Sequence, residues 1–93
     1  SEAIRLEPKD ATRYAARAGS YGDKKDFDRA LKDANEAVRL DPKLADAYFR
    51  RGYIYGELKD FKKSIAEYDA AIRLDPEMNS AYQNRGHSYW QLK

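Results

Sequence analysis

Three prolines divide the chain into units of equal length. They stand at positions 8, 42 and 76, so successive prolines are 34 residues apart. Each closes a near-copy of one phrase, which reads EAIRLEP, EAVRLDP and AAIRLDP in turn. A repeated unit of this length cannot bury its apolar face alone, so it must stack on its neighbours. The spacing therefore predicts a solenoid with a long concave surface rather than a single globule.

The repeat runs through the whole unit, because residues 34 positions apart agree in type at many places. The aligned sets are Tyr14, Tyr48 and Tyr82; Arg17, Arg51 and Arg85; Ala18, Gly52 and Gly86; Tyr21, Tyr55 and Tyr89; then Asp26 with Asp60, Phe27 with Phe61, Leu31 with Ile65, Ala37 with Ala71, and Leu40 with Leu74. A bulky aromatic, a small residue four positions on, a tyrosine, a later alanine and a closing proline resemble the tetratricopeptide repeat family. The resemblance implies an all-α, right-handed superhelical solenoid of antiparallel helix hairpins.

A period of 3.6 residues in the apolar pattern predicts two helices in each unit. The first helix is expected at 11–24, 45–58 and 79–92, and the second at 27–40 and 61–74. We expect one domain, 1–93. Its parts are the end of a preceding second helix at 1–8, complete repeats at 11–44 and 45–78, and the first helix of a third repeat at 79–93.

The ends of the second helices carry recognisable signals. Asp26 and Asp60 directly precede these helices, where a carboxylate can accept the free N–H groups of the first turn. The prolines at 42 and 76 then stop the helices, because the residue before a proline is pushed out of the α region. Lys25 and Lys59 stand where the resembled family usually has a turn glycine. If the turn requires a positive φ, each lysine carries strain of about 1 kcal/mol.

Helical spacing also predicts the buried faces. One stripe of a first helix, with Tyr48, Arg51, Gly52 and Tyr55, is expected to meet Ile65, Tyr68 and Ile72 of its paired helix. The Ala18, Gly52 and Gly86 line is expected to mark close approaches between helices. The arginine line is unusual on a packed stripe. Its preferred explanation is structural pairing of Arg17 with Asp33 and of Arg51 with Glu67, and the alternative is a ligand-facing role.

The resemblance implies that the opposite stripe of each first helix lines the concave groove. In the second unit the stripe is Asp46, Phe49, Arg50, Tyr53 and Glu57, and in the third it is Gln83, Asn84, His87, Trp90 and Gln91. Aromatic side chains beside amide and charged groups are typical of peptide-binding surfaces. We therefore expect the ligand-binding residues to be Phe49, Arg50, Tyr53, Glu57, Gln83, Asn84, His87 and Trp90.

Two further expectations concern this groove. The first unit contributes a stripe of small residues with little binding capacity: Thr12, Ala15, Ala16, Gly19 and Asp23. The alternative to a binding role is that Phe49, Tyr53 and Trp90 pack between adjacent helices.

One subtype of the resembled family binds the C-terminal carboxylate of a chaperone tail with a clamp of lysine, asparagine and arginine side chains. The corresponding positions here are Ala15, Gly19, Arg50, Ser80 and Asn84, none of which matches. Chaperone-tail binding of that kind is therefore not expected, although Arg50 could bind a single carboxylate.

Composition and motifs give little support for catalysis. No Gly-rich phosphate loop, nucleophile elbow or metal-ligand spacing occurs, and the only histidine, His87, has no catalytic partner in the sequence pattern. The absence of cysteine excludes disulfides and thiolate chemistry. We expect no enzyme activity, no catalytic residue, no cofactor and no metal. Without an 18-residue apolar run or a signal-like start, we also expect no membrane insertion and a cytoplasmic location.

The charge pattern does not favour a nucleic-acid partner, and we do not expect one. The net charge is only +2, and acids interrupt the basic residues of the second helices. These basic residues are Arg29, Lys32, Arg39, Lys62, Lys63 and Arg73. The resemblance to tetratricopeptide repeats, together with the side chains of the groove stripe, implies a protein-interaction module that binds a peptide or helix of a partner protein in its groove.

The alternative is self-association. The lone helix 79–93 would leave Tyr82, Tyr89 and Gly86 without a covering helix, while Ala3, Ile4 and Leu6 are residue types that could cover such a patch. This contact would join molecules head to tail into a homo-oligomer or a longer superhelix.

Overall fold

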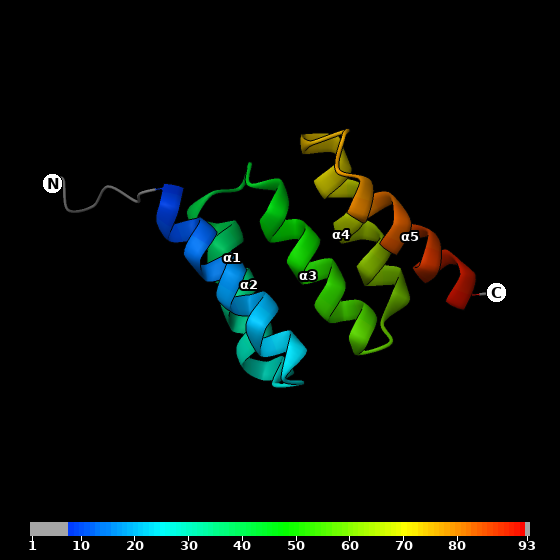
Figure 1. Ribbon diagram of the computed structural model, residues 1–93, viewed down its shortest axis with the longest axis horizontal. Helices are drawn as coiled ribbons and strands as arrows, with labels where there is room; N and C mark the ends of the chain where they lie inside the picture. The colour runs from blue at the N-terminus through cyan, green and yellow to red at the C-terminus, as the bar shows by residue number, and fades with distance from the viewer. Residues whose placement is uncertain (1–7, 93) are drawn as a thin grey trace, which may run out of the picture.

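The computed structural model describes residues 8–92, which form five α-helices joined by short turns and contain no strand. The helices are α1 (Pro8–Asp23), α2 (Phe27–Leu40), α3 (Ala45–Glu57), α4 (Phe61–Leu74) and α5 (Asn79–Gln91). Figure 1 shows α1, α3 and α5 side by side in front of α2 and α4. The all-α architecture of stacked hairpins predicted from the repeat is confirmed. The segment 1–8, expected to end a preceding helix, lies almost wholly outside the described residues.

The start of α1 differs from the prediction. This helix begins at Pro8, three residues before the expected position, whereas Pro42 and Pro76 lie in the turns between helices. Proline suits the first position of a helix, because its φ is already helical and the N–H it lacks would have had no partner there. Pro8 therefore opens α1.

The turn inside each hairpin has the predicted chemistry. Asp26 and Asp60 are the N-caps of α2 and α4, and their side chains accept hydrogen bonds from the third residue beyond each. Lys25 and Lys59 have φ of 64° and 66°. At the end of α3, Lys59 N–H bonds to the Gly56 carbonyl and Asp60 N–H to the Tyr55 carbonyl, which is the Schellman arrangement that requires a left-handed residue. The lysines therefore occupy positions that favour glycine.

We expect Lys59→Gly to raise the free energy of unfolding by about 0.5–1 kcal/mol, because relief of the left-handed strain exceeds the entropy lost with glycine. The matched change Lys32→Gly, at an exposed position within α2, should lower it by about 1 kcal/mol. Urea denaturation of both variants measures the two values. Equal destabilisation by both changes would contradict the strain at Lys59.

Small residues make the helix interfaces. One buried cluster joins α1, α2 and α3 through Ala18, Ala30, Ala34 and Ile54, and another joins them through Ala15, Ala37 and Ala47. A third joins α4 to α5 through Tyr68, Ala71 and Ala81, with Tyr48, Phe49 and Ile72 of α3 and α4 packed against it. Alanine lets helix axes approach closely, so the core is thin and sensitive to side-chain volume.

The predicted close approaches hold at two of three positions. Ala18 is fully buried, and a Cβ at Gly52 would lie 2.9 Å from the Tyr68 ring. Gly86 is different, because a Cβ there would meet nothing within 4 Å. The expected close approach at Gly86 is therefore wrong in this structure. Such a contact would need a helix packed on α5 as α4 packs on α3, and the described residues contain none.

The arginine line pairs as expected and also bridges consecutive units. Arg17 Nε lies 2.7 Å from Asp33 Oδ2, and the buried Nε of Arg51 forms an ion pair at 3.0 Å with Glu67 Oε1 without hydrogen-bond alignment. Arg51 also donates to Asn35 Oδ1 of the preceding hairpin. Arg85 makes the same backward contact, at 2.6 Å, to Asp69. Arg51 thus ties α3 to the second helices on both of its sides.

Arg51→Met should be tolerated better than Glu67→Gln. Both side chains are less than one-fifth exposed, so loss of the acid leaves a largely desolvated guanidinium, whereas methionine fills similar volume without a charge. We expect Glu67→Gln to lower the free energy of unfolding by about 2 kcal/mol and Arg51→Met by about 1 kcal/mol. Thermal denaturation of the two variants gives the ranking. Equal and negligible effects would show that water solvates both groups.

Candidate functional site

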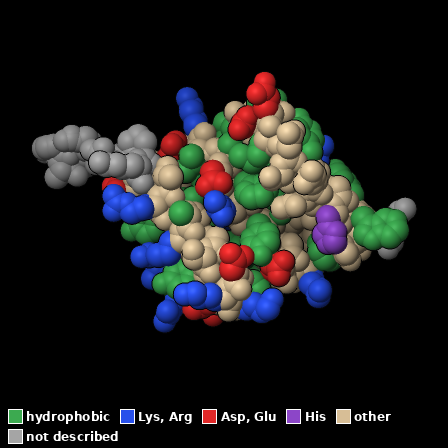
Figure 2. All heavy atoms as spheres, in the orientation of Figure 1, with side chains coloured by type: hydrophobic (Ala, Val, Ile, Leu, Met, Phe, Trp, Pro, Cys, Tyr) green, Lys and Arg blue, Asp and Glu red, His purple; other side chains and the backbone are tan. Residues whose placement is uncertain are grey.

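One broad face of the molecule is formed by α1, α3 and α5, and the eight side chains singled out from the sequence all belong to α3 and α5. The exposed ones are Glu57, Gln83, His87 and Trp90, and the partly buried ones are Phe49, Arg50, Tyr53 and Asn84. Figure 2 views this face. Hydrophobic and acidic side chains gather over its middle, with a basic side chain among them, and the single histidine lies to their right, over α5.

A small pocket lies between α3 and α5, with a volume of about 140 Å³. Its lining residues are Tyr53, Gly56, Glu57, Tyr68, Asn84, His87 and Ser88. Half of the predicted set therefore meets at one place, and the four that line the pocket are Tyr53, Glu57, Asn84 and His87. The other four, Phe49, Arg50, Gln83 and Trp90, are not among its lining residues.

Sequence reasoning missed the part that Tyr68 plays in this pocket. Tyr68 belongs to α4 and is only 2% exposed, as expected for the core stripe to which helical spacing assigned it. Its hydroxyl end nevertheless reaches the pocket, because a tyrosine is long enough to cross the interface between α3 and α5. The sequence could have indicated this role, because the hydroxyl of a tyrosine with a buried ring needs a polar partner.

Both tyrosine hydroxyls of the pocket stay protonated at neutral pH. Burial raises the pKa of Tyr68 to about 12 against a smaller opposing effect of its hydrogen bond with Asn84. Burial also raises the pKa of Tyr53, helped by the hydrogen bond that its hydroxyl donates to Asp23 and by the charges of Glu57 and Asp23. The pocket therefore contains neutral phenols that can donate or accept hydrogen bonds.

Phe49 and Tyr53 serve partly as packing residues. The Phe49 ring lies 5.7 Å from the Tyr68 ring, centroid to centroid, and Tyr53 packs against the buried cluster that contains Ile54. Trp90 behaves differently, because it is 67% exposed on α5. Packing between helices thus applies to Phe49 and Tyr53, while most of the Trp90 side chain faces outward.

The first unit contributes more to this face than its small residues suggested. The Asp23 carboxylate accepts a hydrogen bond from the Tyr53 hydroxyl at 3.0 Å. A Cβ at Gly19 would lie 2.5 Å from Nη1 of Arg50, so the glycine makes room for that guanidinium, which also pairs with Asp46. Ala15 was expected on the groove stripe, but it is fully buried against α2 and α3. Because α1 packs closely on α2 and α3, this position of α1 faces the core.

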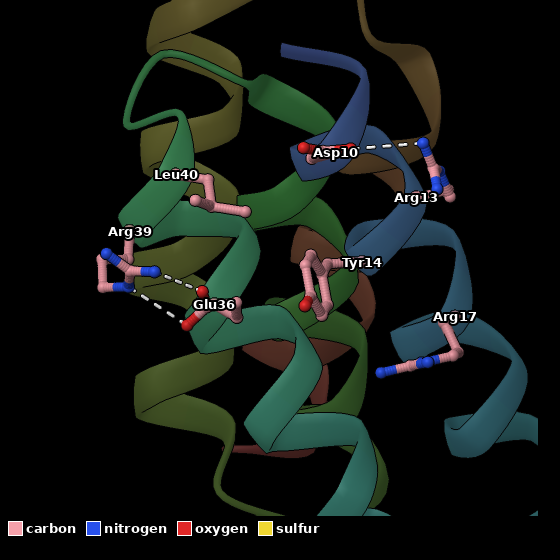
Figure 3. Close-up of a pocket in the computed structure, with 7 residues that line it drawn as sticks. All are labelled: Asp10, Arg13, Tyr14, Arg17, Glu36, Arg39 and Leu40. Carbon is pink, nitrogen blue, oxygen red and sulfur yellow. Dashed lines mark hydrogen bonds and ion pairs between the residues drawn. The ribbon is translucent and has the colours of Figure 1, made fainter. Parts of the chain in front are cut away.

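A second and larger hollow, of about 600 Å³, lies between α1 and α2 and was not predicted from the sequence. Figure 3 shows the residues that line it: Asp10, Arg13, Tyr14, Arg17, Glu36, Arg39 and Leu40. Each of its three arginines already has an acidic partner: Asp10 for Arg13, Asp33 for Arg17 and Glu36 for Arg39. Its charges are therefore compensated internally, and a charged ligand would have to displace these pairs.

Among residues 8–92, no three His, Cys, Asp or Glu side chains are placed to hold a metal ion together. None of the helices in that part of the chain has the length and apolar character needed to cross a membrane.

The sequence matches the tetratricopeptide repeat family over residues 15–79, which is more than half of the chain. The chain therefore belongs to the tetratricopeptide repeat family. A comparison with curated proteins gave no match.

Similar solved structures are tetratricopeptide repeat (TPR) domains. The first such domain of Spaghetti (RPAP3), bound to the HSP90 peptide SRMEEVD, is 26% identical with a TM-score of 0.83, over 94% of this chain and 67% of that one. The Arabidopsis OM64 TPR domain is 32% identical with a TM-score of 0.80, over 94% and 72%. The yeast Sti1 TPR2B domain, in complex with pHsp70, is 29% identical with a TM-score of 0.74, over 95% and 72%.

Proposed function

We propose that this chain is a protein-interaction module that binds a segment of a partner protein across the face formed by α1, α3 and α5. The observation that carries the proposal is the pocket between α3 and α5, where Tyr53, Glu57, Asn84 and His87 converge from consecutive units. Amide, hydroxyl and carboxylate groups beside aromatic rings suit an extended peptide, because the rings supply contact area and the polar groups fix its register.

Two similar domains support this function. The Spaghetti domain was solved with an HSP90 peptide and the Sti1 domain in a pHsp70 complex, so this fold has room for a bound peptide or protein segment. No constellation among the described residues favours catalysis, and a binding role needs none.

Selection of a random 12-residue peptide library on the immobilised chain, followed by fluorescence polarisation, tests the proposal. The double variant His87→Ala, Trp90→Ala removes two exposed side chains of the face and should weaken the selected peptide at least tenfold. The control Lys32→Ala, Arg73→Ala on the outer helices should leave affinity within twofold. The opposite ranking, with unchanged circular dichroism, would place the binding surface on the outer face.

A second candidate is head-to-tail self-association, and the exposed apolar side chains of α5 favour it. Tyr82 is 41% exposed, Tyr89 is 53% exposed, and Gly86 leaves an open notch between them. Sedimentation velocity from micromolar to millimolar concentration would show growing species if a second copy covers this surface. A single monomeric species across that range would remove the candidate.

A further inference from the structure

Two carboxylates stand at equivalent helix ends at one edge of the binding face. Asp23 and Glu57 are the last residues of α1 and α3, and they are 34 positions apart, so they occupy equivalent places in successive units. The C-terminal end of a helix already carries the negative pole of its dipole, which makes a carboxylate there unfavourable for stability. By contrast, α2 and α4 have arginines in their last turns, and α1 and α3 have no basic residue there. The acids thus oppose helix stability at the edge where the pocket opens.

The pocket itself has no strongly basic side chain in its lining. Its lining residues include no lysine or arginine, and Glu57 is the only carboxylate among them. The Asp23 carboxylate lies beside the pocket, where it accepts a hydrogen bond from the hydroxyl of the lining residue Tyr53. The one arginine of this face that was singled out, Arg50, is paired with Asp46 and lies over Gly19 of α1. The chain has 18 basic residues and a net charge of +2, so the absence of lysine and arginine from the pocket lining is not a property of the whole surface.

The size and walls of the pocket suit one long side chain. Its volume of about 140 Å³ is well below the several hundred Å³ of a site that encloses a small molecule. The ring of Tyr53 contributes an aromatic wall, on which an aliphatic stem can pack and toward which a cation is attracted. Carboxylate, amide and phenol oxygens at the pocket can all accept hydrogen bonds.

We propose that the pocket between α3 and α5 receives a lysine or arginine side chain of the partner peptide. The cationic head pairs with Glu57 and bonds to Asn84 and the phenol oxygens, and the stem packs on Tyr53. Because burial holds the pKa of Tyr68 near 12, its hydroxyl remains a neutral acceptor when the cation enters. This inference rests on the proposed function, and it names the chemistry of the partner.

The same chemistry separates this chain from one of its structural neighbours. The peptide bound to the Spaghetti domain, SRMEEVD, has three acidic residues toward its end. A pocket that is lined by the Glu57 carboxylate and by no lysine or arginine would disfavour such a segment. An acidic or a purely apolar side chain of the peptide in this pocket would therefore contradict the proposal.

The test uses the peptide selected from the random library. We expect selected sequences to share a lysine or arginine at one position, and none to carry an acid there. In the tightest peptide, replacement of that basic residue by norleucine should weaken binding to the wild-type chain about tenfold but to Glu57→Gln less than twofold, because the two changes remove the same interaction. Glu77→Gln, an equal charge change at an exposed turn, should keep wild-type affinity. Circular dichroism should show Glu57→Gln folded, because it removes an acid from a helix C-terminus.

The outcomes separate the two proposals. Peptides that lose affinity with His87→Ala, Trp90→Ala but share no basic residue, or that bind Glu57→Gln as well as wild type, overturn the basic-side-chain inference and leave the proposed function standing. Peptides that ignore the His87→Ala, Trp90→Ala change, or a library without binders, overturn the proposed function and this inference with it.

Discussion

Gly52→Leu should lower the free energy of unfolding by about 3 kcal/mol, which corresponds to about 12–24 °C in melting temperature for a chain of this size. A Cβ at Gly52 would lie 2.9 and 3.0 Å from two atoms of the Tyr68 ring and 3.2 Å from Glu67 Cβ. The Tyr68 ring is buried against Phe49, so it cannot swing aside, and the leucine must push α3 away from α4. The better helix propensity of leucine, about 0.8 kcal/mol, offsets only a small part of this cost.

Gly86→Leu is the matched control for that change. Gly86 occupies the same place in the next unit, but a Cβ there would have no neighbouring atom within 4 Å. Leucine there should raise the free energy of unfolding by about 0.5–1 kcal/mol through helix propensity alone. Differential scanning calorimetry of the two variants measures the contrast. Melting of Gly52→Leu within a degree or two of wild type would refute the close approach of α3 and α4.

Ile54→Ala should be the most damaging truncation in the chain, with a loss of about 2–5 kcal/mol. Ile54 is fully buried where α3 meets α1 and α2, and its buried neighbours are the alanines Ala18, Ala30 and Ala34. Alanines cannot extend to fill the space that the isoleucine leaves, so a cavity should remain. The loss should therefore lie in the upper half of that range.

Leu74→Ala provides the comparison for this truncation, because Leu74 ends α4 and is 41% exposed. It should cost less than about 1 kcal/mol. Guanidinium denaturation gives both free energies. A cost for Ile54→Ala no larger than that for Leu74→Ala would mean that the α1, α2 and α3 interface is not packed around Ile54.

The hairpins could be predicted from the sequence because the same local rules operate twice at a fixed spacing. The caps at Asp26 and Asp60, the left-handed Lys25 and Lys59, and the turn prolines each act over a few residues. Because the spacing is 34 residues throughout, a helix end or cap identified in one unit predicts the same feature 34 residues later in the next. The pairing of arginines with acids followed from the same register.

The features that could not be predicted depend on how units stack, which local spacing does not determine. The backward contact of Arg85 with Asp69 crosses from one unit to the next. The hydroxyls of Ser64 and Ser88 meet in the core at places equivalent to Ala30 and Ile54, so the α4 and α5 junction uses a hydrogen bond where the α2 and α3 junction uses apolar packing. A change of core chemistry between equivalent interfaces is visible only when both partners are known.

The candidate site was predicted in outline and altered in detail for the same reason. Helical periodicity placed Glu57 and His87 on equivalent stripes of their helices, and the family resemblance implied that these stripes share one face. The structure joins the two residues in a pocket. The structure also places Tyr68 of α4 in the pocket lining, and it shows a hydrogen bond between Asp23 of the first unit and Tyr53. Those two contacts arise from the distance between helix axes, which alanine and glycine at the interfaces set.

The most direct measurement of where this chain binds is a ¹⁵N-edited NMR titration with the tightest selected peptide. If the partner lies across α1, α3 and α5, the largest shift changes should fall on the amides of Tyr53, Glu57, Asn84 and His87, with those of α2 and of the outer side of α4 nearly unchanged. Saturable changes centred instead on Lys32 and Arg73, with the pocket amides unmoved, would contradict a binding site on that face.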